Sequence, residues 1–232
     1  MRGRAVLLSK CAYIFCGGQT LALYAEGPAL PFGVRTSLRP RGEVVLGLTG
    51  LEDDDGFHPW RLAPERETPY RHFDLAAVSS AVREAQSRES IRLQAEVLRG
   101  LYAGPEELAA SLIGRGPGLT PSGDDALVGV LYALHKTGSA YPLAQAVSAL
   151  TDRTNVISAI FLSAAAQGEI FSALEEVFGP RAPAAAVALS RCGASSGQAV
   201  LAGLSAGLAF SENRKDQVPG VKAEIDPEEQ KV

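Results

Sequence analysis

The stretch that decides most about the fold is Gly114-Arg115-Gly116-Pro117-Gly118-Leu119-Thr120-Pro121-Ser122-Gly123-Asp124-Asp125. Its alternating glycines indicate a backbone with unusual dihedral angles, or one that another group approaches closely. Thr120 and Pro121 suit the N-cap and first position of a helix, and Ser122 with Asp125 offers a capping box one step later. The sequence therefore predicts that a helix begins here, and the apolar residues that follow would form its buried face.

A glycine-rich turn that leads into a helix N-terminus is a good site for a small anion. Free N–H groups and the positive end of the helix dipole point the same way. The stretch lacks the Lys-Ser/Thr of a P-loop and the spacing of a dinucleotide-binding fingerprint, so no nucleotide or redox cofactor is indicated. The expected ligand-binding residues of this segment are Gly116, Gly118, Thr120, Ser122 and Gly123.

Asp124 and Asp125 complicate a bare anion site, because carboxylates repel an anion unless a cation lies between them. In one interpretation they are the catalytic pair and hold Mg²⁺, which bridges to a phosphate or carboxylate ligand. In the other they stabilise the helix through its own dipole, and no ligand is needed. The sequence leaves both interpretations open.

Two further helix starts repeat this chemistry. Asn155 and Ser158 lie where an apolar helix begins, and Ser195 and Ser196 open another. Taken singly, each is an ordinary N-cap. If the three starts converge on one pocket, these four residues line the wall opposite the glycine-rich loop.

The two halves of the chain differ in pattern. Short β-rich runs separated by Pro and Gly occupy the beginning, whereas the remainder is helical and rich in Ala, Leu, Gly and Ser. We expect an α+β fold, with a small β-rich N-terminal sheet or barrel followed by a larger, mainly helical bundle. The expected parts are 1–74 with a charged connector, a helical domain at 75–211 that carries the motifs, and a flexible polar tail at 212–232.

Composition narrows the function further. The chain has 232 residues and a net charge of −4. It lacks the excess of basic residues with which proteins bind nucleic acid. No apolar run is long enough to span a bilayer, and the N-terminus lacks a signal-peptide core. Three cysteines without a paired motif argue against a disulfide framework or zinc site. We therefore expect a cytoplasmic protein that contacts neither nucleic acid nor membrane.

The motifs resemble one family. Gly-Pro-Gly-Leu-Thr-Pro-Ser-Gly-Asp-Asp at 116–125, Thr154-Asn155 with Ile157-Ser158, and Ser195-Ser196-Gly197 occur in this order in a domain-of-unknown-function family. That family includes the AllH-type subunit of oxamate carbamoyltransferase, and the likeness covers most of residues 10–210. A His often precedes Ser-Ser-Gly in the family, whereas this chain has Ala194.

The resemblance implies a subunit of a multi-protein enzyme in anaerobic allantoin and purine breakdown. That enzyme phosphorolyses oxalurate to oxamate and carbamoyl phosphate. Its partners would be a small anionic metabolite and the other subunits of a hetero-oligomeric enzyme. Phosphate, carbamoyl phosphate and oxamate are small anions, so this expectation agrees with the anion site predicted from the residues.

Two other functions remain open at the level of sequence. The chain is a non-catalytic scaffold or partner-docking subunit if the motifs are only helix caps and packing sites. It is a stand-alone hydrolase if the isolated chain turns over a small metabolite.

Overall fold

The computed structural model describes residues 73–169 and 172–215, and before them the backbone of five strands. The strands are β1 (Arg2–Leu7), β2 (Cys11–Cys16), β3 (Gln19–Tyr24), β4 (Gly33–Arg35) and β5 (Gly42–Val45). They are ordered β4-β3-β2-β1-β5, with antiparallel pairing except between β3 and β4. Most of the predicted connector and nearly all of the predicted tail lie outside the described residues.

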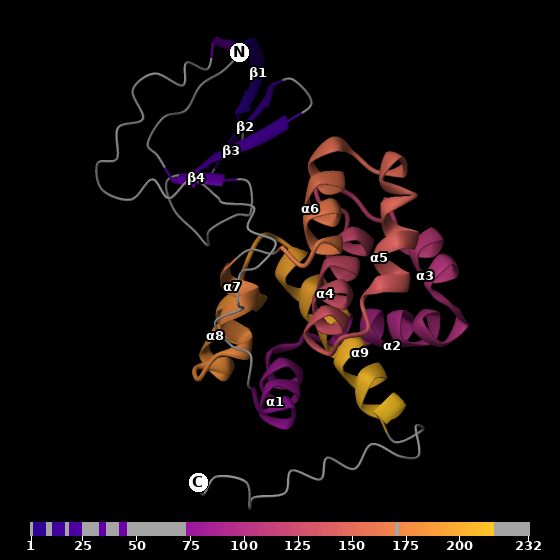
Figure 1. The fold of residues 1–232 in the computed structure, drawn as a ribbon. Coiled ribbons are helices and arrows are strands. Elements are labelled where there is room, and N and C mark those ends of the chain that lie inside the picture. The colour runs from indigo at the N-terminus through magenta and orange to yellow at the C-terminus, as the bar shows by residue number, and fades with distance from the viewer. Residues whose placement is uncertain are drawn as a thin grey trace, which may run out of the picture.

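Eleven helical segments follow in residues 73–169 and 172–215 (Figure 1). They are α1 (Leu75–Ala85), α2 (Arg88–Ala103), α3 (Pro105–Leu112), α4 (Ser122–Lys136), α5 (Tyr141–Ser148), η1 (Thr151–Arg153), α6 (Val156–Ala166), α7 (Ser172–Glu175), η2 (Glu176–Phe178), α8 (Ala182–Ser190) and α9 (Ser196–Lys215). No helix of these described ranges is long and apolar enough to cross a membrane.

The predicted α+β fold class is wrong. Helices make up 76% of residues 73–169 and 172–215, and this part of the chain contains no strand, sheet or barrel. Its hydrophobic core runs from Val78 to Leu208 and draws only on the helices and the loops between them. Leu23, the strand residue whose side chain is described, is buried but is not part of that core. The described domain is all-α, because its helices bury their apolar side chains against one another.

Helix α4 lies at the centre of this domain, and α9 packs along it (Figure 1). Every residue from Gly123 to Leu134 is buried. The two helices approach closely because glycines lie at their contact. A Cβ atom on Gly129 would overlap the carbonyl oxygen of Val200, and one on Gly203 would overlap that of Ala126. The small residues of the sequence therefore hold two helix backbones together.

A helical sequence pattern is interrupted between α1 and α2. Residues 81–99 read as one charge-laced amphipathic stretch, but α1 ends at Ala85 and α2 begins at Arg88. Ser87 is the N-cap of α2, and its side chain accepts a hydrogen bond from the Ser90 N–H. Its own N–H donates to Oε1 of Gln198 at 2.7 Å. A contact from α9 thus helps to fix a break that the local pattern does not reveal.

Candidate functional site

Asp124 joins the glycine-rich loop to the start of α6. Its side chain lies on the first turn of α4, and only 1% of the residue is exposed. Oδ1 accepts a hydrogen bond from the Gly114 N–H at 2.7 Å. Oδ2 accepts from the hydroxyls of Thr154 at 2.5 Å and Ser158 at 2.6 Å. Both carboxylate oxygens are therefore occupied by donors of this chain, so Asp124 positions the surrounding segments.

Asp125 is the next residue, and its surroundings differ. Only 8% of it is exposed, and its Oδ2 is buried without a hydrogen-bond partner. Burial raises the pKa of this carboxyl to about 7, although the nearby hydroxyls of Ser196 and Thr120 lower it and the charge of Asp124 raises it further. A carboxyl with a pKa near neutrality can hold or release a proton at physiological pH, as a catalytic acid or base does.

The starts of α4 and α9 meet beside Asp125. The hydroxyls of Thr120 and Ser196 lie 2.9 Å apart and share a hydrogen bond. The N-cap of α4 is Pro121, and no side chain caps this helix. The predicted cap by Thr120 is therefore wrong, because its hydroxyl pairs with α9 instead. No side chain satisfies the N–H groups of this first turn, and the N–H of Gly123 donates to the Arg115 carbonyl instead.

The glycines of the loop have different surroundings. Gly118 is exposed, has a φ of +98° and leaves open space where a Cβ would stand. A Cβ on Gly116 would lie 2.8 Å from the Ser122 hydroxyl oxygen. One on Gly123 would overlap the carbonyl oxygen of Leu112, and the Gly123 N–H already donates to the Arg115 carbonyl at 2.9 Å. Gly123 is therefore a packing position, whereas Gly118 leaves room for an approaching group.

The start of α6 faces Asp124. Asn155 is its N-cap and accepts hydrogen bonds from the N–H groups of Ile157 and Ser158, both at 3.1 Å. The Ser158 side chain is buried and donates to Asp124. The N-cap prediction for Asn155 is confirmed, and its side-chain oxygen is already used. Asn155 and Ser158 were predicted to line the wall opposite the loop. In the structure their side chains hydrogen-bond to other groups of this chain.

At the start of α9 the two serines differ. Ser195 is exposed, whereas Ser196 is the first helical residue and contacts Thr120. The spacing of Ser195 and Gln198 would suit a capping box, but these two side chains do not form one. The Gln198 amide instead accepts from the Ser87 N–H and donates to the Ala85 carbonyl at 3.1 Å. A contact between residues 111 positions apart replaces the local one.

The described residues offer few side-chain ligands for a metal ion that the protein would coordinate alone. Among the described residues no three His, Cys, Asp or Glu side chains gather to hold one. Asp124 has three hydrogen-bond donors on its oxygens, which is the environment of a satisfied carboxylate. Oδ2 of Asp125 is one oxygen without a partner. Mg²⁺ normally keeps several waters and one or two carboxylates, so Asp125 with a bound phosphate would fit it and Asp124 would not.

A second charged pair borders the loop. The Arg115 guanidinium binds the Glu96 carboxylate through two contacts, one of them between Nη2 and Oε2 at 3.0 Å. This hydrogen bond lowers the pKa of Glu96, which desolvation alone would raise. Both side chains are about two-fifths exposed, so the pair contributes only modestly to stability. The ion pair holds Arg115 in place, and the Arg115 carbonyl accepts the hydrogen bond from the Gly123 N–H.

Sequence reasoning missed two members of this arrangement. Thr154 binds Asp124 through its hydroxyl, and Gln198 ties α9 to the break between α1 and α2. The position of Thr154 just before the α6 cap was a usable signal, because threonine beside an N-cap often binds nearby polar groups. For Gln198 the local sequence contained no such signal.

These segments together match one family. Residues 112–208 match the model of the family described as oxamate carbamoyltransferase subunit AllH. The match confirms the resemblance found in the motifs and covers the loop and helices α4 to α9 up to residue 208. Asp124, Asp125 and the hydroxyls of Thr120, Thr154, Ser158 and Ser196 lie within the part that is similar to AllH. No curated protein and no solved structure matches the chain.

Proposed function

We propose that this chain is the small-anion-binding subunit of an oxamate carbamoyltransferase-type enzyme. The observation that carries the proposal is the meeting of three helix starts around one turn of α4. Asp124 binds the loop and the start of α6, and Thr120 binds the start of α9. The similarity of this region to AllH supports carbamoyl phosphate, phosphate, oxalurate or oxamate as the ligand.

The starts of α4 and α9 supply the attraction for the anion. The 15-residue α4 and the 20-residue α9 begin beside one another, so the positive ends of their dipoles add. The hydroxyls of Thr120, Ser122 and Ser196 donate hydrogen bonds to phosphate or carboxylate oxygens. The exposed backbone at Gly118 approaches the ligand without a side chain in the way. Asp124 acts indirectly, because it holds the loop and α6 in place.

Phosphorolysis of oxalurate requires that the site position the two reactants and stabilise the charge that develops between them. A phosphate oxygen attacks the carbamoyl carbon, the bond from that carbon to the oxamate nitrogen breaks, and the leaving nitrogen takes a proton. N–H groups and hydroxyls at the helix starts hold the phosphate and its developing charge. Asp125 is the group beside them that can exchange a proton near neutral pH. Mg²⁺, if bound with the ligand, would add positive charge beside Asp125.

A titration calorimetry experiment tests the proposal on the purified chain. Inorganic phosphate, carbamoyl phosphate and oxamate are titrated separately, each with and without Mg²⁺. We expect saturable binding of at least one of them, weakened tenfold or more by Thr120→Val. Thr151→Val is the matched control, because it removes a threonine hydroxyl that donates to the Ser148 carbonyl outside the site. Absence of binding at millimolar concentration for all three ligands would refute the proposal.

A scaffold function is the second candidate, and a specific observation favours it. Leu119 in the loop and Val156 at the start of α6 are large apolar side chains with 46% and 56% exposure. Exposed apolar residues at a functional face often contact a partner. The test replaces both with Ser and measures co-purification with partner subunits. Loss of the complex with retained anion binding separates docking from ligand binding.

A further inference from the structure

The site contains a buried acceptor without a donor. Oδ2 of Asp125 has no hydrogen-bond partner, although 92% of the residue is buried, since its exposure is 8%. A buried polar atom without a partner costs free energy, so structures normally satisfy it with protein, water or ligand. This atom lies at the first turn of α4, beside the beginning of α9.

The neighbouring donors do not reach this oxygen. The hydroxyls of Thr120 and Ser196 lie 2.9 Å apart, and both also hydrogen-bond to the Asp125 side chain, which lowers its pKa. The hydroxyls of Thr154 and Ser158 and the N–H of Gly114 all donate to Asp124. Oδ2 of Asp125 is thus the one carboxylate oxygen of the two aspartates that is buried without a partner. An entering group that satisfies it must bring an N–H or O–H of its own.

We propose that Asp125 accepts a hydrogen bond from the primary amide nitrogen of the ligand, and thereby selects carbamoyl-type ligands over ligands with a methyl group at that position. This inference rests on the proposed function, in which the anionic part of the same ligand binds at the starts of α4 and α9. A carboxylate next to an anion site would repel the ligand in any orientation except the one that places its NH₂ group at Asp125. Asp125 thus sets orientation and specificity.

Binding free energy supports such selection. A site whose buried acceptor needs a donor discriminates strongly against an analogue that lacks it, because the acceptor is then left unpaired. The structure keeps Asp124 out of this role, since its oxygens are already bound by this chain. Asp124 therefore positions the surrounding segments, and Asp125 recognises the ligand.

Two pairs of nearly isosteric compounds test the inference. Oxamate and pyruvate differ by NH₂ against CH₃, and so do carbamoyl phosphate and acetyl phosphate. Dissociation constants are measured by calorimetry at pH 8, where Asp125 is mostly ionised. For the unmodified chain we expect the NH₂ compound of each pair to bind at least tenfold more tightly. Asp125→Leu removes the acceptor and should reduce that ratio to within about threefold. Asp152→Leu, an equal loss of charge at an exposed position, should leave the ratio unchanged.

The outcomes distinguish this inference from the proposed function. Equal binding of oxamate and pyruvate by the unmodified chain overturns the role of Asp125, while the anion site stands. The same conclusion follows if Asp125→Leu keeps the full preference. If neither these compounds nor phosphate binds, the proposed function fails and the inference fails with it. Should Asp125→Leu not fold, Asp125→Asn replaces it, and we expect a ratio reduced at least threefold because an amide oxygen is the weaker acceptor.

Discussion

Asp124 and Asp125 are adjacent in the chain, but the first has three hydrogen-bond donors on its carboxylate and the second has a buried oxygen with none. Successive helical residues point about 100° apart, so neighbours on α4 face different segments. Asp124 faces the loop and α6, whereas Asp125 faces the start of α9. This difference underlies the first two predictions.

Asp124→Ala should lower the free energy of unfolding by about 2–4 kcal/mol. It leaves an N–H and two hydroxyls in a buried region without their acceptor, and each such loss costs about 1–3 kcal/mol when solvent cannot replace it. Urea denaturation followed by circular dichroism measures the change. Asp124→Asn keeps one acceptor and should lose less. A loss below about 1 kcal/mol for the alanine variant would show that Asp124 does not hold these segments together.

Asp125 should make the protein less stable as pH rises. Its pKa is about 7 in the folded chain and about 4 in an unfolded one, so between these values the folded state binds more protons. Stability is therefore lost from about pH 4 to about pH 7. Asp125→Asn removes this term and should be the more stable protein at pH 8 by about 1–3 kcal/mol, with little difference at pH 4. A constant difference across that range would contradict the raised pKa.

The close contact of α4 and α9 predicts a severe effect of one added methyl group. Gly203→Ala places a Cβ on the carbonyl oxygen of Ala126, so we expect a loss of at least about 3 kcal/mol or failure to fold. Gly118→Ala is the control, because open space surrounds it and only its φ of +98° is unfavourable. That control should lose about 1 kcal/mol. Equal melting temperatures for the two variants would refute the predicted contact.

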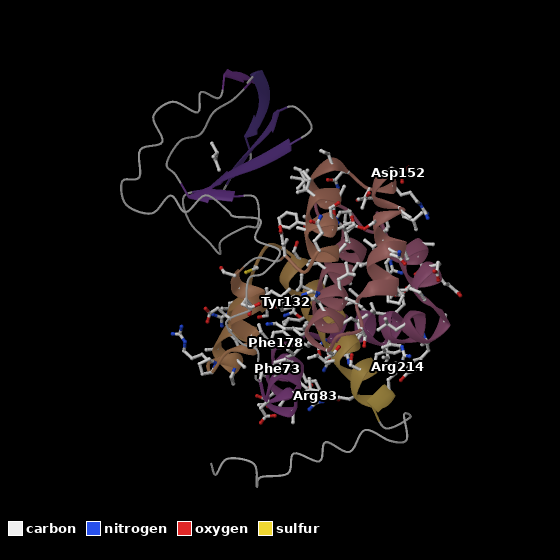
Figure 2. The ribbon with its side chains drawn as sticks, viewed as in Figure 1. Phe73, Arg83, Tyr132, Asp152, Phe178 and Arg214 are labelled. Atoms are coloured by element: carbon white, nitrogen blue, oxygen red, sulfur yellow. The ribbon has the colours of Figure 1, made fainter. Side chains whose placement is uncertain are left out.

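A buried ion pair at the other end of α4 gives a fourth prediction. Lys136 Nζ lies 3.0 Å from the Glu175 carboxylate and 5.3 Å from the ring centres of Tyr132 and Phe178. Figure 2 shows the two rings, with Phe73 beside Phe178. Burial lowers the pKa of Lys136 to about 8 and raises that of Glu175 to about 7, so desolvation outweighs the attraction in both groups.

Glu175→Gln should therefore destabilise the chain by about 2–4 kcal/mol, because the Lys136 side chain is only 4% exposed and the charge of this carboxylate at 3.0 Å is removed. The double variant Lys136→Met with Glu175→Leu should recover at least half of that loss. Chemical denaturation of the single and double variants measures both values. Additive losses would show that the two groups do not depend on each other.

Local signals in the sequence were enough to locate the important helix starts. Asn155 caps α6 as predicted, and α4 begins within two residues of the predicted position. Gly138, the residue type typical of the position after a helix end, has a φ of +77° just beyond the C-cap of α4. Such features depend on contacts among residues a few positions apart, which the order of residue types specifies. The motifs also predicted the family that residues 112–208 match.

Only the tertiary structure decided which residues meet. Thr120 pairs with Ser196 across 76 positions, which replaces the predicted cap of α4 by Thr120. Asp124 pairs with Ser158 across 34 positions, and this contact distinguishes Asp124 from Asp125. The all-α core likewise replaced the predicted α+β fold, because burial is decided by which apolar faces find each other. A hydroxyl or carboxylate has several nearly equal partners within its own segment. The close packing of α4 against α9 determines which of them it takes.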